Sequence, residues 1–338
     1  MTSRIGTLQW PLPQWPLPWA LWLRAHAQFL VVFACALAIR VTYNLTIARH
    51  YVPVSDAHEY VLLGQRLLAG KCYCLWGDGH PTTYRSPGFP LLLAAVFAVA
   101  GPTNTLAARL AVSVVGAGTC VLTSLIARDL FGPRATLPAG LIAATYPQLF
   151  INDAWLNSES LATFLFAASC LAIMRVVKQP PGWRWLAAGA LLGLTALTRP
   201  NGAYALGAAL LWVALAIWRR WQRWRRGTLA AALLVAGFLV VVAPWTARNY
   251  VVTQGAFVPL STGGGIVIAG AYTDLAYKGP NMWSAWFNPW RNPTWSASDR
   301  EALSRFPPNC WGRCEVVRDE ATTAIGLRWA RAHVIVLP

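Results

Sequence analysis

The chain has 338 residues, of which 56% are hydrophobic and 12% charged, and its mean hydropathy is +0.44. These values exclude an ordinary soluble globule and indicate an integral membrane protein. A net charge of +16 would suit nucleic acid, but the basic residues gather in short loops between apolar runs, so we expect the lipid bilayer and no nucleic acid as partner.

The apolar runs predict membrane spans. About 20 apolar residues cross a hydrocarbon core of roughly 30 Å, and cytoplasmic loops carry the excess of Lys and Arg. The Trp- and Pro-rich residues 1–27 predict a cytoplasmic interfacial segment rather than a cleavable signal peptide. Seven spans are expected to follow, over residues 28–47, 106–127, 135–151, 160–175, 185–198, 203–218 and 228–247.

The short apolar run at 87–100 decides the threading. Its fourteen residues reach only about 21 Å as a helix, so we expect it to dip into the membrane or lie along it. Every basic loop then falls inside and every acid except Asp129 outside. Residues 28–247 become a transmembrane module with an outer loop at 48–105, and residues 248–338 a small soluble outer segment. The apolar end of the chain predicts shortening relative to a longer parent.

Asp56 and Glu59 lie in the first outer loop, and acidic residues are scarce, with twelve in the whole chain. The pattern predicts a short amphipathic helix over 55–69, with both carboxylates and Tyr60 on one face. Asp56 would there act as a general base toward an acceptor nucleophile. The alternative is that Ser55 or Asp56 only caps the helix.

Arg85 precedes the Pro-Gly-Phe-Pro sequence that opens the short apolar run. Exposed N–H groups at a helix start attract anions, and an arginine beside them predicts a phosphate clamp. An ordinary interfacial arginine is the alternative.

A second acidic group, Asp153 and Glu159, lies in the turn between the third and fourth predicted spans. Glu159 is expected to face the same outer cavity as Asp56, although Asn157 or Ser158 could simply cap the next helix. Arg40 lies well inside the first span, where an ionisable residue is by default a functional hypothesis. Its partner is expected to be Glu159 or Asp153.

Arg199 and Arg248 end two outward-going spans and would reach a lipid phosphate at the outer mouth, unless they are only interfacial anchors. The following Gly263-Gly264-Gly265 run could approach a ligand with bare backbone, although flexibility is the simpler interpretation.

The seven cysteines divide by position. Cys35, Cys120 and Cys170 lie in spans and are expected to be inert packing. The other four fall outside: Cys310 and Cys314 have a spacing that a turn at Gly312 can close into a disulfide, whereas Cys72–Cys74 looks too tight. A metal site from Cys72, Cys74 and His80 would match no common zinc spacing. Walker, Rossmann and His-Glu-x-x-His motifs are absent, so neither a sugar-nucleotide donor nor an ATP donor is indicated and no cofactor is expected.

Taken in order, these pieces resemble the GT-C class of polytopic glycosyltransferases that use polyprenyl-phosphate sugars, such as protein O-mannosyltransferases and lipid A aminoarabinose transferases. The resemblance covers roughly residues 35–270 and rests on Arg40, Asp56, Glu59-Tyr60, Pro87–Pro90, Tyr146-Pro147, Asn157–Glu159, Leu197–Pro200, Pro244–Tyr250 and Ser261–Gly264.

The resemblance implies an all-α integral membrane protein with interfacial helices in the first outer loop. It matches Asp56 to the family's catalytic Asp, Glu159 to its second acidic position and Arg85 to a basic position. This chain departs from the family in lacking the further spans. It also has Tyr84 where aminoarabinose transferases place a metal-binding Glu, so no metal is predicted from that motif and a divalent cation stays open.

These observations lead to an expected function. A sugar would move from a polyprenyl-phosphate carrier to a lipid, glycan or protein acceptor on the periplasmic face of a bacterial inner membrane. Asp56, Glu59 and Glu159 would be the catalytic residues, and Arg85, Arg199 and Arg248 would bind the donor phosphate. A polytopic transporter or lipid flippase is the alternative, and a scaffold derived from a truncated enzyme is a third interpretation.

Overall fold

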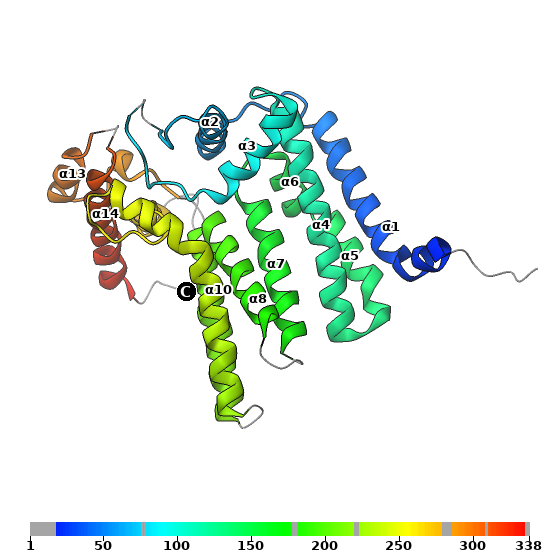
Figure 1. Ribbon diagram of the computed structural model, residues 1–338. Helices are drawn as coiled ribbons and strands as arrows, with labels where there is room; N and C mark the ends of the chain where they lie inside the picture. Colours follow the sequence, from blue (N-terminus) through cyan, green and yellow to red (C-terminus); the bar gives the residue numbers. More distant parts are fainter. Residues whose placement is uncertain are drawn as a thin grey trace, which may run out of the picture.

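The computed structural model describes residues 18–75, 77, 79–177, 182–219, 223–278, 286–307 and 310–334. The described residues form helices and no named strand, which confirms the expected all-α fold (Figure 1). The main helices are α1 (Pro18–Leu45), α2 (Asp56–Leu68), α3 (Gly88–Ala100), α4 (Thr105–Phe131), α5 (Thr136–Thr145), α6 (Pro147–Ala154), α7 (Glu159–Val176), α8 (Trp183–Thr198), α9 (Ala203–Trp218), α10 (Trp224–Val252), α11 (Gly264–Ala271), α12 (Asp274–Lys278), α13 (Ala297–Ser304) and α14 (Arg313–Ala332). Short 3-10 turns cover Pro133–Ala135, Pro200–Gly202 and Pro289–Arg291. The predicted interfacial segment 1–27 lies largely outside the described residues.

Among the residues that the structure describes, five helices are long and apolar enough to cross a membrane: α1, α4, α7, α9 with the turn before it, and α10. The prediction of one continuous span over 135–151 is wrong, because the chain breaks between α5 and α6 at Tyr146-Pro147. Proline cannot supply the N–H that would continue the helix, and Tyr146 is accordingly extended. Pro244, in contrast, lies inside α10, which continues to Val252.

Helix α8 has 16 residues and is stabilised by close packing against α10. A Cβ added to Gly189 would lie 2.1 Å from the Leu234 carbonyl oxygen, and one added to Gly237 would lie 2.0 Å from the Leu186 oxygen. Small residues that let two backbones approach in this way are typical of helix pairs in membranes.

The segment between α1 and α4 holds α2 and α3, which pack on each other and on the start of α4. Tyr60, Phe89 and Leu93 are buried in the cluster that joins them. The expected helix over 55–69 is thus observed, with its apolar face turned inward. Helix α3 has 13 residues and is a short apolar helix rather than a candidate span.

The bundle has two chemically different ends (Figure 1). Helix α2, the start of α7, and the ends of α8 and α10 lie at the upper end, with α13 and α14 beside them. The end of α4 with the start of α5, the end of α7 with the start of α8, and the end of α9 with the start of α10 lie at the lower end, and these helix ends flank the basic loops. The chain thereby separates the candidate site from its positive loops by the length of the bundle.

Candidate active site

Asp56 and Glu59 project from the first turn of α2. Ser55 occupies the N-cap position, as the alternative interpretation expected, although its side chain makes no capping bond, and both carboxylates lie in the first turn, where negative charge suits a helix N-terminus. Ser55 itself has φ 52° and ψ −126°. A non-glycine residue with such a backbone is strained, by about 1–3 kcal/mol, and such residues concentrate at functional sites.

Arg85 bridges the two carboxylates. Its Nε donates to Glu59 Oε2 and its Nη2 to Asp56 Oδ1, each at 2.6 Å. The guanidinium also lies over the Tyr60 and Tyr84 rings, 5.2 and 4.6 Å from their centroids. The side chains of Arg85 and Glu59 are 16% and 22% exposed, whereas that of Asp56 is 53% exposed. Asp56 is therefore the member of the cluster that can meet a molecule from outside.

The surroundings shift two ionisation equilibria in this cluster. Burial raises the pKa of Glu59 above its ordinary value, and this effect exceeds the lowering by Arg85. Burial acts to lower the pKa of Arg85, but Tyr60, Tyr84, Glu59 and Asp56 together raise it above its ordinary value. Arg85 therefore stays cationic throughout the accessible pH range.

Glu159 and Arg199 form a second ion pair, half-exposed at the adjoining ends of α7 and α8. Arg199 Nη1 also donates to Ser158 Oγ at 3.4 Å, and that hydroxyl is 3.1 Å from the Tyr60 hydroxyl. Tyr60 thus connects the second pair to the Arg85 cluster, since Arg85 lies over the same ring. The structure therefore connects five of the predicted charged residues in one polar network: Asp56, Glu59, Arg85, Glu159 and Arg199.

Arg248 lies apart from both ion pairs. Its Nη1 donates to the Thr82 carbonyl oxygen at 2.6 Å, and its guanidinium lies 4.7 Å from the Trp245 ring centroid and 5.4 Å from that of Tyr73. Arg248 therefore holds the segment that leads to Arg85, rather than facing Glu159 or Asp56.

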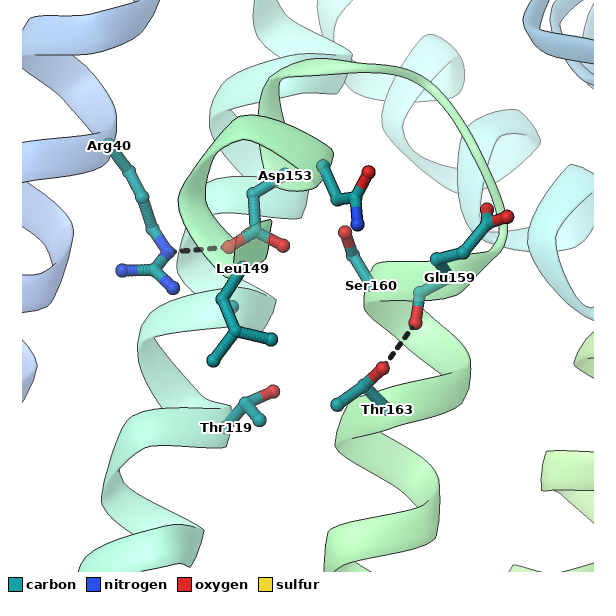
Figure 2. A pocket seen from close by; sticks show the side chains of 9 residues that line it. Arg40, Thr119, Leu149, Asp153, Glu159, Ser160 and Thr163 are labelled. Atoms are coloured by element: carbon teal, nitrogen blue, oxygen red, sulfur yellow. Dashed lines mark hydrogen bonds and ion pairs between the residues drawn. The ribbon is translucent and has the colours of Figure 1, made fainter. Parts of the chain in front are cut away.

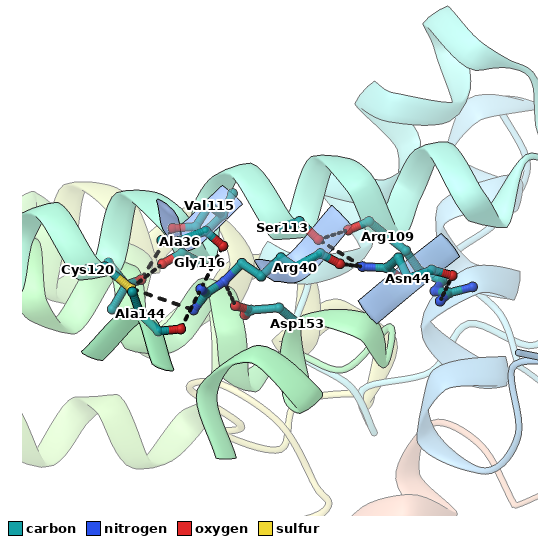
Figure 3. A network of polar contacts seen from close by, with 11 residues as sticks. Ala36, Arg40, Asn44, Arg109, Ser113, Val115, Gly116, Cys120, Ala144 and Asp153 are labelled. Atoms are coloured by element: carbon teal, nitrogen blue, oxygen red, sulfur yellow. Dashed lines mark hydrogen bonds and ion pairs between the residues drawn. The ribbon is translucent and has the colours of Figure 1, made fainter. Parts of the chain in front are cut away.

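The partner of Arg40 is Asp153, which settles the alternative left open by the sequence. Arg40 Nε lies 2.5 Å from Asp153 Oδ2, and both side chains are buried (Figure 3). The same guanidinium donates to the Ala36 carbonyl at 3.1 Å and approaches Cys120. The pair connects α1, α4 and α6, and it is not part of the Arg85 cluster.

A small cavity of ≈ 20 Å³ lies beside this ion pair, lined by Arg40, Asp153, Glu159, Thr119 and Thr163 (Figure 2). That volume is about what one water molecule requires. Gly116 forms part of the wall, and a Cβ there would lie 1.8 Å from Asp153 Oδ2. The cavity is too small for a sugar.

A larger groove of ≈ 590 Å³ opens between α7 and α9, and Glu159 and Arg199 stand at its mouth. Its remaining wall is mainly apolar or small, from Ala162, Phe166, Tyr204, Ala205 and Ala208. A groove with an ion pair at one end and an apolar wall beyond it suits an amphipathic, lipid-like molecule.

Cys72–Cys74 and Cys310–Cys314 are both disulfides. The predicted Cys310–Cys314 bond is confirmed, with 5.5 Å between Cα atoms. The expectation against Cys72–Cys74 is wrong, because the chain bends at Tyr73 and the two Cα atoms lie 5.3 Å apart, within the range that a disulfide accepts. These bonds remove the thiolates that a metal site with His80 would need. In the described part of the chain, no group of three or more His, Cys, Asp or Glu could hold a metal ion.

Comparison with known families places these residues in a context. Residues 80–247, about half of the chain, match the family model described as dolichyl-phosphate-mannose-protein mannosyltransferase. The chain carries a GT-C family domain. This domain supports a membrane glycosyltransferase that uses polyprenyl-phosphate sugar donors. No curated protein and no solved structure shows significant similarity to the chain.

The GT-C domain includes Arg85, Glu159 and Arg199, whereas Asp56 and Glu59 precede the matched region. Arg248 follows its last residue directly. The polar network is therefore formed by residues of the GT-C domain together with residues of α2.

The sequence does not assign three buried residues to this site: Tyr60, Ser158 and Glu315. The sequence places Tyr60 on the face of the two carboxylates and offers Ser158 as a helix cap. It does not reveal that the two hydroxyls meet, and Ser158 makes no side-chain capping bond. Glu315 of α14 is fully buried against Thr82 and Thr83, just before Arg85. No local pattern could reveal that contact, since 232 residues separate Thr83 from Glu315.

Proposed function

We propose that this protein transfers a sugar from a polyprenyl-phosphate carrier to an acceptor hydroxyl or amine on the outer face of the membrane. The observation that carries the proposal is the Arg85 bridge to Asp56 and Glu59, with 2.6 Å at each contact. This bridge places the partly exposed Asp56 carboxylate beside the cationic Arg85. Arg85 belongs to a domain whose family uses lipid-phosphate sugars.

In the proposed reaction the acceptor atom attacks the anomeric carbon while the bond from that carbon to the carrier phosphate breaks. Asp56 takes the proton that the acceptor loses, and the phosphate leaves as an anion. Arg85 would stabilise that anion, because a preorganised cation is most valuable where charge grows in the transition state. The Arg85 Nε and Nη2 already donate to Glu59 and Asp56. Within the described residues Nη1 makes no hydrogen bond, so it can donate to a phosphate oxygen.

The groove between α7 and α9 supports the placement of the donor. Its apolar wall suits an isoprenoid chain, and Arg199 at its mouth suits the phosphate. Glu159 would release Arg199 to the phosphate and contact the sugar or acceptor. Arg248 assists indirectly in this scheme, by holding Thr82, the third residue before Arg85.

Two features support an outer, periplasmic site in a bacterial inner membrane. The basic loops lie at the opposite end of the bundle, as expected for cytoplasmic loops. The two disulfides belong to the segments that carry Arg85 and Glu315, and disulfides persist in oxidising compartments.

The test uses the purified full-length protein in liposomes with polyprenyl-phosphate-mannose as donor probe and membrane extracts as acceptor source. We expect covalent mannose transfer, reduced about 10²–10⁴-fold in Asp56→Asn because the general base is lost. Glu301→Gln, in α13, serves as the control for loss of an exposed carboxylate and should retain activity. Undiminished transfer by Asp56→Asn would refute the role of Asp56. Movement of the donor across the bilayer without transfer would favour the transporter or flippase.

A further inference from the structure

The backbone just before Arg85 is held by a carboxylate from the far end of the chain. Glu315 of α14 accepts hydrogen bonds from Thr82 Oγ1 at 2.5 Å and from the Thr83 N–H and Thr83 Oγ1 at 2.7 Å each. Its side chain is fully buried. A buried carboxylate is costly unless its oxygens are hydrogen-bonded. This one has three donors from two consecutive residues and a longer fourth bond from Thr262 Oγ1 at 3.5 Å.

The remaining polar groups of this dipeptide are held from other directions. Thr82 N–H donates to the Tyr73 oxygen at 2.9 Å, and Arg248 donates to the Thr82 oxygen. The Thr83 oxygen accepts from Thr262 N–H at 3.0 Å. The dipeptide is thus fixed by the first outer loop, by α10, by the loop before α11 and by α14 at once.

This fixation continues into the candidate site. Tyr84 N–H donates to Thr82 Oγ1 at 3.0 Å, and the Arg85 carbonyl accepts from the Tyr73 hydroxyl at 3.2 Å. Arg318, one helical turn after Glu315, lies over the Tyr84 ring, 5.6 Å from its centroid. Arg85 lies over the same ring at 4.6 Å. Helix α14 therefore contacts the two residues that precede Arg85: Glu315 contacts Thr83, and Arg318 contacts Tyr84. The placement of the Arg85 guanidinium depends on both.

The helix is itself anchored beside the glycine-rich loop. Asp319 Oδ1 accepts from the Gly265 N–H at 2.6 Å, and a Cβ at Gly265 would lie 2.1 Å from the Asp319 carbonyl oxygen. The interpretation of this loop as flexible is therefore wrong, because Gly265 is needed for close approach to α14. The loop serves the docking of the C-terminal helix.

From these contacts we infer that Glu315 is a positioning residue for Arg85, and that α14 belongs to the functional site instead of being an accessory segment. This inference rests on the proposed function for its catalytic consequence. Glu315 touches neither donor nor acceptor. It sets the backbone from which Arg85 reaches Asp56, Glu59 and the leaving phosphate.

The structural part of the inference is tested by hydrogen–deuterium exchange of the full chain in nanodiscs. Both Thr83 donors reach the same oxygen, Glu315 Oε2. Glu315→Gln removes the charge and turns the other oxygen into an NH₂ group, so the bonds to Thr83 weaken and the Thr83 amide should exchange at least ten-fold faster. Glu320→Gln, on the exposed side of the same helix, is the matched control and should leave this peptide unchanged. Equal exchange in Glu315→Gln and the wild type would overturn the inference.

The functional part is tested by steady-state transfer from polyprenyl-phosphate-mannose. Glu315→Gln should lower kcat about ten-fold or more, with KM for the donor changed less than three-fold, because Arg85 stabilises the leaving phosphate and the groove still binds the lipid. Thr83→Val, which keeps the N–H and removes the hydroxyl, should show a smaller effect of the same kind. A merely structural role would lower the amount of folded protein and leave kcat per folded molecule unchanged, and that result would also overturn the inference. Lack of transfer in the wild type would instead refute the proposed function, and the exchange measurement would still decide whether Glu315 positions this segment.

Discussion

Arg40 of α1 and Asp153 of α6 form an ion pair across the interior of the bundle, with 2.5 Å between Nε and Oδ2 and neither side chain more than 4% exposed. Gly116 of α4 leaves the space that the carboxylate fills, since a Cβ there would overlap it. The pair therefore joins three helices at the point where the expected third span breaks at Pro147. We interpret this ion pair as the contact that holds α6 in place, because α5 does not continue into α6 as one helix.

Loss of this pair should strongly destabilise the fold. Asp153→Asn leaves a buried, uncompensated guanidinium, which costs about 3–5 kcal/mol of unfolding free energy. The half-exposed Arg175–Asp129 pair is the matched control, because Asp129→Asn should cost at most about 1 kcal/mol. Unfolding in mild detergent measures both. Equal effects of the two substitutions would contradict a special role for the buried pair.

The close contact between α8 and α10 should make Gly237 intolerant of a side chain. Gly237→Ala places a Cβ against the Leu186 carbonyl, and overpacking of this kind costs about 1–3 kcal/mol. Gly207→Ala in α9 meets nothing within 4 Å and should be neutral or stabilising by about 0.5–1 kcal/mol. Thermal unfolding of the two variants should thus shift in opposite directions. A stabilised Gly237→Ala would show that the two backbones lie farther apart.

How much of this site could be foreseen depends on sequence separation. Asp56, Glu59 and Arg85 lie within one loop, and the amphipathic pattern of α2 already places the two carboxylates together. The partner of Arg40 could be narrowed to two acids but not chosen, because helix spacing does not define how α6 turns relative to α1. The break at Pro147 had a local signal, since proline ends a preceding helix, and the apolar composition around it outweighed that signal. Glu315 had none, because its contacts exist only once α14 docks.

Filling the groove between α7 and α9 should weaken donor binding without disturbing the Arg85 cluster. Ala208→Trp occupies the apolar wall, so KM for a long-chain polyprenyl-phosphate-mannose should rise about ten-fold, with a smaller rise for a short-chain analogue. Val240→Trp, at an exposed position of α10 outside the groove, is the control for the added indole. If both donors lose affinity equally, or if Val240→Trp has the same effect, the isoprenoid chain binds elsewhere.

The docking of α14 should depend on pH through Asp319. Burial raises the pKa of its carboxyl to about 6 from an ordinary value of 3.8, although the Gly265 N–H lowers it. A raised carboxyl pKa means that the folded state binds the proton more tightly, so this contribution to stability is complete below about pH 4 and is lost as the pH rises through about 6. Asp319→Asn should therefore flatten the fall of the unfolding midpoint between pH 4 and 7. Glu320→Gln controls for the change in net charge, and an Asp319→Asn profile parallel to the wild type would contradict this assignment.

The side of the membrane on which the site lies can be measured without a substrate. In a background that lacks Cys35, Cys120 and Cys170, single cysteines replace Ala297 in α13 and Arg223 before α10, both exposed. The positive-inside rule assigns Arg223 to the cytoplasm, and Ala297 belongs to the same C-terminal segment as Glu315. An impermeant maleimide should therefore label the Ala297→Cys protein in intact spheroplasts, and the Arg223→Cys protein only after permeabilisation. Labelling of Arg223→Cys in intact cells would reverse the orientation of the bundle. The Arg85 cluster would then face the cytoplasm, and an outer acceptor could not reach Asp56.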